Sequence, residues 1–212
     1  IAALVVRPSS GMEKTQQNMA LQPIRPDRTL AVLWVIFAAG SCSGLIVLGF
    51  AAQFLTHGPG DVALAGLAVF LVATGNTLGR LSSALTAGRF GPTHGIAGAL
   101  ILSIISLACL IVATSPGVVV GLLFLVAFAY GQLAATTPLL VKTHVAAPAF
   151  AGSFGWVFTG WGLAGLVGPW TAGWLLDATG THRFALLLCI ALAALSLWLV
   201  MRLARRSAAE AC

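Results

Sequence analysis

One charged residue within a long apolar stretch is the feature of this sequence that most directly suggests chemistry. Residues 62–78 contain no charged side chain, and Arg80 follows two positions later, before the apolar pattern ends. A charge inside a membrane span is costly and is usually kept because a ligand or a pathway needs it. Arginine also presents a planar fork of donors that binds a carboxylate through two charge-assisted hydrogen bonds. We therefore predict that Arg80 binds an anionic substrate.

The competing interpretation is that Arg80 has no functional role. If its helix continues to Gly88, the arginine lies about 12 Å from the helix end at 1.5 Å per residue. Its long side chain could then reach toward the membrane surface. No Asp or Glu occurs between Asp61 and Asp177. The counter-charge of Arg80 must therefore come from a substrate, from water or from another part of the protein.

Other polar and aromatic side chains in the apolar stretches are candidates for the same site. Asn76 lies one helical turn before Arg80, where it could add a hydrogen bond to the substrate. Trp161 lies near the middle of its apolar stretch, where an indole either lines a cavity or packs in a core. Tyr130 and Gln132 could face a cavity or hydrogen-bond across helices. The predicted substrate-binding residues are therefore Arg80, Asn76, Trp161, Tyr130 and Gln132.

The composition places this chain in a membrane. Of its 212 residues, 59% are hydrophobic and 8% are charged, whereas soluble domains carry about 25% charged residues. The net charge of +6 comes from basic residues scattered at the ends of apolar stretches, which is typical of membrane orientation and not of nucleic-acid binding. Gly160, Gly162 and Gly165 match a dinucleotide-binding fingerprint, but no strand precedes them. We expect no enzyme activity, no cofactor and no metal.

Six apolar segments are long enough to cross a hydrocarbon core, which needs about 20 residues per helix. Glycine, proline and other turn residues separate them, and such tight connections predict an antiparallel bundle of helices. The predicted spans cover residues 30–52, 62–85, 94–113, 118–141, 153–176 and 184–203.

The regions outside these spans suggest how the bundle is connected. Residues 1–8 resemble the last turns of a membrane helix, and residues 9–29 form a polar stretch typical of a linker. Residues 30–204 then form the six-helix domain, and residues 205–212 form a tail. We therefore expect the chain to be the second half of a longer protein, whose first half supplies six further spans.

The basic residues predict the orientation of the bundle. An even number of spans places Arg28, Arg89 and Lys142 on one side, and the opposite loops offer only Arg183. By the positive-inside rule, both ends of this chain are then cytoplasmic, and we expect the plasma (inner) membrane. A cysteine introduced at Ala147 should accordingly react with an impermeant reagent only after permeabilisation.

Glycines are concentrated in the second and fifth spans. Gly75 and Gly79 are four residues apart, a spacing that lets membrane helices approach closely. The fifth span contains Gly160, Gly162 and Gly165. A glycine-rich helix of this kind bends easily, so it could either take part in gating or simply pack as a kinked helix.

The pattern resembles the C-terminal half of a major facilitator superfamily transporter. In that superfamily a signature loop follows the second helix of each half. In this sequence the matching positions are Ala84, Gly88, Arg89 and Gly91, and the first glycine and the aspartate of the family's loop are replaced. Two stretches resemble the oxalate/formate antiporter and monocarboxylate transporter branch of the superfamily. One contains Asn76, Gly79 and Arg80, and the other covers residues 154–180.

The resemblance implies an all-α fold, in which six transmembrane helices form one half of the transporter as two inverted three-helix repeats. It implies a secondary transporter of small mono- or dicarboxylates that works by alternating access. Arg80 would bind the carboxylate, and Gly79 and the fifth-span glycines would serve gating. The expected partners are a small organic anion, the lipid bilayer and a six-helix N-terminal half. An efflux transporter for drugs or sugars, and a non-transporting membrane subunit or scaffold, remain the alternatives.

Overall fold

The computed structural model describes residues 27–55 and 62–210, and within them every regular element is a helix. The predicted helix end at residues 1–8 and most of the predicted linker lie outside the described residues. The elements are α2 (Arg28–Phe50), α3 (Val62–Phe90), α4 (Pro92–Val112), α5 (Pro116–Lys142), the short 3-10 helix η1 (Ala147–Ala149), α6 (Phe150–Thr179) and α7 (Arg183–Glu210).

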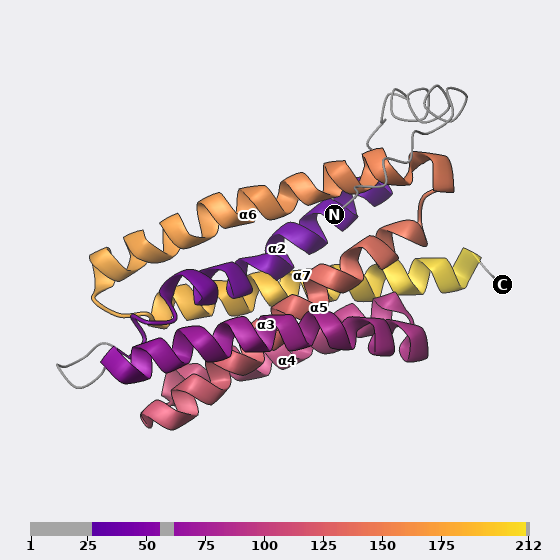
Figure 1. The fold of residues 1–212 in the computed structure, drawn as a ribbon. Helices are drawn as coiled ribbons and strands as arrows, with labels where there is room; N and C mark the ends of the chain where they lie inside the picture. The colour runs from indigo at the N-terminus through magenta and orange to yellow at the C-terminus, as the bar shows by residue number, and fades with distance from the viewer. Residues whose placement is uncertain (1–26, 56–61, 211–212) are drawn as a thin grey trace, which may run out of the picture.

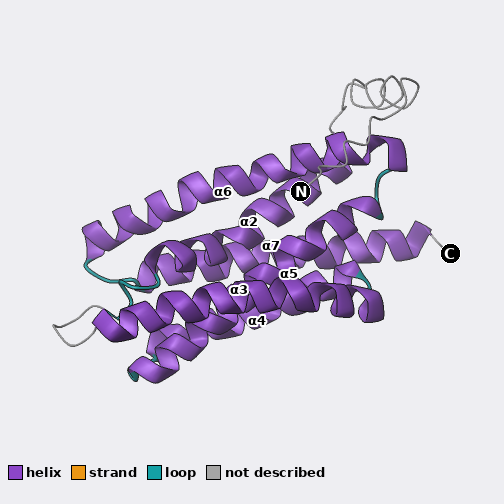
Figure 2. Ribbon diagram, in the orientation of Figure 1, coloured by secondary structure: helices purple, strands orange, loops and turns teal. Residues whose placement is uncertain are grey.

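The six α-helices are each long and apolar enough to cross a membrane. They run roughly along one common axis, and the start of α2 lies at the same end as the ends of α3, α5 and α7 (Figures 1 and 2). The predicted number of candidate spans and the all-helical class are therefore confirmed.

The end of α3 differs from the prediction. The predicted span ends at residue 85 and a loop is expected after it, but α3 continues through Phe90, and the backbone leaves the helix only at Gly91, where φ is +80°. Gly88 does not end the helix because one glycine in a helix costs only about 1 kcal/mol. Pro92 then begins α4 at a position where a proline loses no hydrogen bond.

The last two helices are also longer than their predicted spans. The α6 helix runs through Asp177 to Thr179 and ends at Gly180, whose φ of +68° suits a left-handed cap. The α7 helix continues to Glu210, so residues 205–210 of the predicted tail are helical. Alanine and arginine dominate that segment and are strong helix formers, and no glycine or proline interrupts it.

Helix α2 and helix α5 form the centre of the bundle. The α3 helix packs mainly on α5, α6 packs mainly on α2, and α4 and α7 pack on each other and on these central helices. The set of packed pairs is unchanged when α2, α3 and α4 are exchanged for α5, α6 and α7. The two halves of the chain therefore make equivalent contacts.

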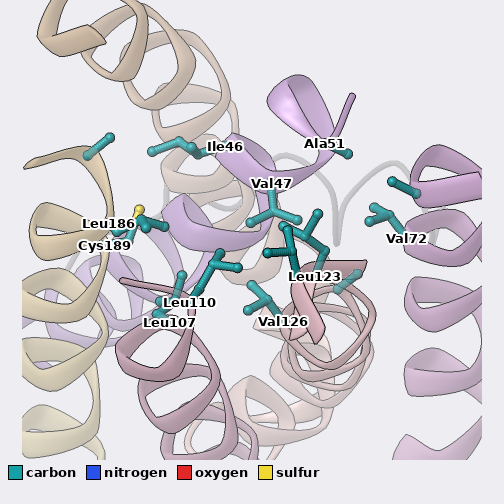
Figure 3. Packing of buried hydrophobic residues seen from close by; sticks show 14 of the residues in the cluster. Ile46, Val47, Ala51, Val72, Leu107, Leu110, Leu123, Val126, Leu186 and Cys189 are labelled. Carbon is teal, nitrogen blue, oxygen red and sulfur yellow. The ribbon is translucent and has the colours of Figure 1, made fainter. Parts of the chain in front are cut away.

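Two clusters of buried side chains fill the bundle. The first joins all six α-helices, with Ala172 on α6, and its members include Ile46, Val47, Val72, Leu107, Leu110, Leu123, Val126, Leu186 and Cys189, which point toward one another in Figure 3. The second, nearer the other end of the bundle, includes Phe37, Ile96, Leu133 and Leu140. Together they align the helices along most of their length.

Helices α3 and α6 are much less buried than the central helices. Within their most apolar windows 28% and 22% of the residues are buried, against 67% in α2 and 56% in α5. Large apolar side chains such as Phe70, Leu81, Leu166 and Trp170 are exposed on these two helices. Contact of these side chains with water would be unfavourable, and exposed apolar faces of this kind are typical of helices that lie against lipid or another protein.

Candidate functional site

Arg80 is held by its neighbour one turn earlier on α3. Its Nε donates a hydrogen bond of 3.2 Å to Oδ1 of Asn76. This bond occupies Nε and leaves the two terminal nitrogens of the guanidinium, the fork that binds a carboxylate, for other partners. The predicted pairing of Asn76 with Arg80 near one site is consistent with this geometry.

Arg80 is not enclosed within the helical bundle. Its side chain is exposed on α3, and the carboxylates of Asp27 and Asp177 lie at the ends of other helices. Because α3 extends to Phe90, Arg80 lies ten residues, or about 15 Å, from the nearer helix end. The bond to Asn76 points the side chain away from that end. This arrangement disfavours the interpretation that Arg80 extends to the membrane surface.

Trp161 and Tyr130 form a second hydrogen-bonded pair, between α6 and α5. The indole Nε1 of Trp161 donates to the Tyr130 hydroxyl at 2.6 Å. Tyr130 is buried, and its ring lies against Gly44 of α2, where a Cβ would overlap the ring atoms. Phe158 stacks on Trp161 with ring centroids 5.0 Å apart. The aromatic pair is therefore fixed by contacts from three helices.

The two pairs lie near each other where α3 packs on α5, because the carbonyl oxygen of Asn76 faces Gly131, the residue after Tyr130. Trp161 approaches the Tyr130 hydroxyl as a donor. A tyrosine hydroxyl that accepts one hydrogen bond still has a proton to donate. Asn76, Arg80, Tyr130 and Trp161 thus bring cationic, amide and hydroxyl donors to the side of the bundle formed by α3 and α6.

Gln132 does not join this group. Its Nε2 donates to Oγ1 of Thr86 at 2.8 Å, which links α5 to α3 further along the bundle. Residues two apart on a helix point about 200° from each other, so Gln132 and Tyr130 leave α5 in different directions. Gln132 and Thr86 line a cavity of about 450 Å³ together with His94.

Gly79 packs tightly against α5. A Cβ at Gly79 would collide with the carbonyl oxygen of Phe128, and a Cβ at Gly75 would come within 2.6 Å of the carbonyl oxygen of Phe124. On the other side of the contact, a Cβ at Gly131 would collide with the carbonyl oxygen of Asn76. These glycines let the α3 and α5 backbones touch directly, as the four-residue spacing predicts.

The residues of the predicted signature loop lie in the last turns of α3 and in the turn that follows it. Ala84, Gly88 and Arg89 are exposed in the last turns of α3, with the Arg89 guanidinium 5.7 Å from the Phe90 ring centroid. Gly91 forms the turn into α4.

On α6, the three predicted glycines differ in what surrounds them. Gly160 faces the backbone of Trp34, and its Cβ would lie 3.0 Å from that carbonyl oxygen. Gly165 lies near Leu45, and Gly162 has open space around it. Of these three, only Gly160 is therefore required for a close approach of α6 to α2.

A hydrogen bond between α2 and α6 was not predicted from the sequence. Trp34 of α2 donates through Nε1 to Oγ1 of Thr159 on α6 at 3.0 Å. Thr159 lies next to Gly160, at the close approach of the two helices. A threonine next to a small residue on a glycine-rich helix is the signal that could have indicated it.

We expect the hydrogen bond between Tyr130 and Trp161 to stabilise the bundle measurably. Tyr130→Phe, Trp161→Phe and the double variant should show a coupling free energy of about 0.5–1.5 kcal/mol in a double-mutant cycle. Unfolding of the purified protein in detergent, followed by circular dichroism, measures it. Strictly additive effects of the two substitutions would contradict the bond.

No protein-family model and no curated protein matches this chain at a significant level.

Proposed function

We propose that this chain is the six-helix C-terminal half of a major facilitator superfamily transporter that moves small mono- or dicarboxylates by alternating access. The observation that carries the proposal is Arg80. It is a permanently charged side chain on an apolar helix, exposed and without a carboxylate partner in the described part of the chain. An anion bound there would supply the missing counter-charge.

The neighbours of Arg80 favour a carboxylate over a neutral solute. Asn76 holds Nε, so the fork of terminal nitrogens can meet the two oxygens of a carboxylate in one plane. The hydroxyl proton of Tyr130 offers a further donor, and the residue after Tyr130, Gly131, faces the carbonyl oxygen of Asn76. In a partly dehydrated cavity, such a charged pair is considerably stronger than in water. A neutral sugar would leave the charge of Arg80 unbalanced.

The packing of the helices supports a transporter half. Exchanging the first three helices for the last three preserves the packed pairs, as expected for two three-helix repeats. In that scheme α3 and α6 are equivalent, and they carry Arg80 and Trp161. The exposed apolar side chains of the same two helices would pack against the six-helix N-terminal half, with the substrate between the halves. Both ends of this chain would be cytoplasmic.

Transport by the full-length protein tests the proposal. Proteoliposomes should accumulate radiolabelled acetate, lactate or oxalate faster than protein-free vesicles. An unlabelled carboxylate should compete, and the uncharged amide of the same acid should not, because it cannot neutralise Arg80.

The alternatives give different outcomes in the same assay. Flux of a sugar or a hydrophobic drug without carboxylate flux would favour an efflux transporter, with Arg80 in a structural role. A folded protein that moves none of these solutes would favour a non-transporting membrane subunit.

A further inference from the structure

A basic cavity lies between α2 and α7, away from the Arg80 site. It has a volume of about 310 Å³ and is lined by Arg28 at the start of α2, by Arg202 and Arg206 on α7, and by His144 after α5. All four residues lie at the end of the bundle where α2 begins and α5 and α7 end. Three guanidinium groups therefore surround one cavity at one end of the bundle.

Among the side chains that the structure describes, no carboxylate lines this cavity. The carboxylate closest in sequence is that of Asp27, and it caps α2 by accepting a hydrogen bond from the Leu30 amide at 2.8 Å. Asp177 lies on α6 near the opposite end of the bundle. An anionic ligand would balance the arginines and offset their mutual repulsion.

Trp198 orients one of the three arginines. The guanidinium carbon of Arg202 lies 3.9 Å from the centroid of the Trp198 ring, close enough for a cation–π interaction. This stacking uses the face of the guanidinium and leaves the N–H donors at its edge available. Those donors are the groups that bind phosphate oxygens in pairs.

The rest of the lining is largely apolar. Val32 of α2 and Leu199 and Leu203 of α7 line the same cavity as the arginines. A free phosphate ion needs no such surface, whereas a phospholipid places its glycerol ester and first methylene groups beside its phosphate. Tryptophan and arginine at a helix end also mark the level of the lipid headgroups. Basic pockets between membrane helices bind anionic headgroups in this way.

We infer that this cavity binds the phosphate headgroup of an anionic glycerophospholipid, with its acyl chains against the apolar side chains of α2 and α7. The lipid would hold the start of α2 to the last turns of α7. This site is separate from the proposed transport site, because none of the residues that line the cavity belongs to the group formed by Asn76, Arg80, Tyr130 and Trp161.

Native mass spectrometry of the full-length protein in detergent tests the inference. Phosphatidylglycerol and phosphatidylcholine with identical acyl chains are titrated separately. We expect phosphatidylglycerol to bind more tightly, and the double variant R202Q/R206Q to weaken it by about tenfold to thirtyfold. R89Q is the matched control, because Arg89 is an exposed arginine at the same end of the bundle but does not line the cavity. R89Q should leave the affinity unchanged.

Three more comparisons distinguish this site from diffuse attraction and from a site for free phosphate. A loss of binding free energy in R89Q that is half the loss in R202Q/R206Q, and so equal per charge removed, would indicate diffuse electrostatic attraction and would overturn the site. Inorganic phosphate that displaces the lipid at millimolar concentration would identify free phosphate as the ligand and would overturn the lipid. The variant R202K/R206K keeps the charge and should recover only part of the affinity. Full recovery would contradict paired binding by the guanidinium groups. Circular dichroism confirms that each variant is folded.

Discussion

Arg80→Lys is expected to lower the initial rate of carboxylate uptake at least about tenfold, with expression and membrane insertion unchanged. Lysine keeps the charge but loses the planar fork and the Nε bond to Asn76. A hydrogen bond to a charged group contributes about 1.5–3 kcal/mol, and about 1.4 kcal/mol corresponds to tenfold. Arg80→Gln also removes the charge and should reduce uptake further. Radiolabelled uptake into proteoliposomes measures both variants.

Arg89→Lys provides the matched control for Arg80. Arg89 lies on the same helix and is also exposed, but it contacts Phe90 and lies nine residues further along α3. Its replacement should leave the affinity for the carboxylate unchanged. If Arg80→Lys and Arg80→Gln both transported carboxylates at the wild-type rate, Arg80 would be a packing residue and the efflux alternative would become the better proposal.

Gly79→Ala and Gly131→Ala are each expected to destabilise the bundle by about 3 kcal/mol. The new methyl group would meet a backbone carbonyl oxygen of the facing helix, at Phe128 or at Asn76. A backbone cannot rotate away as a side chain can, so α3 and α5 would have to separate. Overpacking of this kind typically costs about 1–3 kcal/mol. Thermal unfolding in detergent, followed by circular dichroism, measures the loss.

Two other glycines on the same helices serve as controls. At Gly66 on α3 and Gly121 on α5, a methyl group in place of the glycine hydrogen would have no neighbouring atom within 4 Å. Their replacement by alanine should be neutral or stabilising by up to about 1 kcal/mol, because alanine favours the helix. A Gly79→Ala variant as stable as Gly66→Ala would show that the two backbones are not in contact.

The number of helices could be predicted from the sequence, but their ends could not all be placed. A stretch of about 20 apolar residues is an unambiguous signal. The end of α3 could not be placed because glycine and arginine at positions 88 and 89 suit both a turn and a helix. Of the glycines in this region, only Gly91 has a backbone conformation that a helix forbids.

The site was predictable where its residues share a helix. Asn76 and Arg80 are one turn apart, so their contact follows from helical spacing. The pairing of Tyr130 with Trp161 depends on how α5 and α6 are placed by α2, and single-helix patterns carry no such information. The separation of Gln132 from Tyr130 follows from helical spacing, because residues two apart point in different directions. The bond from Gln132 to Thr86, however, depends on how α3 packs on α5.

The glycine contact between α3 and α5 has a mechanical consequence. At Gly79 and Gly131 the two backbones touch without a deformable side chain between them. We therefore expect α3 and α5 to move as one rigid unit. Helix α5 packs far less on α6 than on α3. A displacement of Arg80 along the axis of α3 would therefore move Tyr130 together with α3. The strain would reach α2 through the Tyr130 ring that lies against Gly44, and it would reach α6 both through α2 and through the hydrogen bond from Trp161 to the Tyr130 hydroxyl.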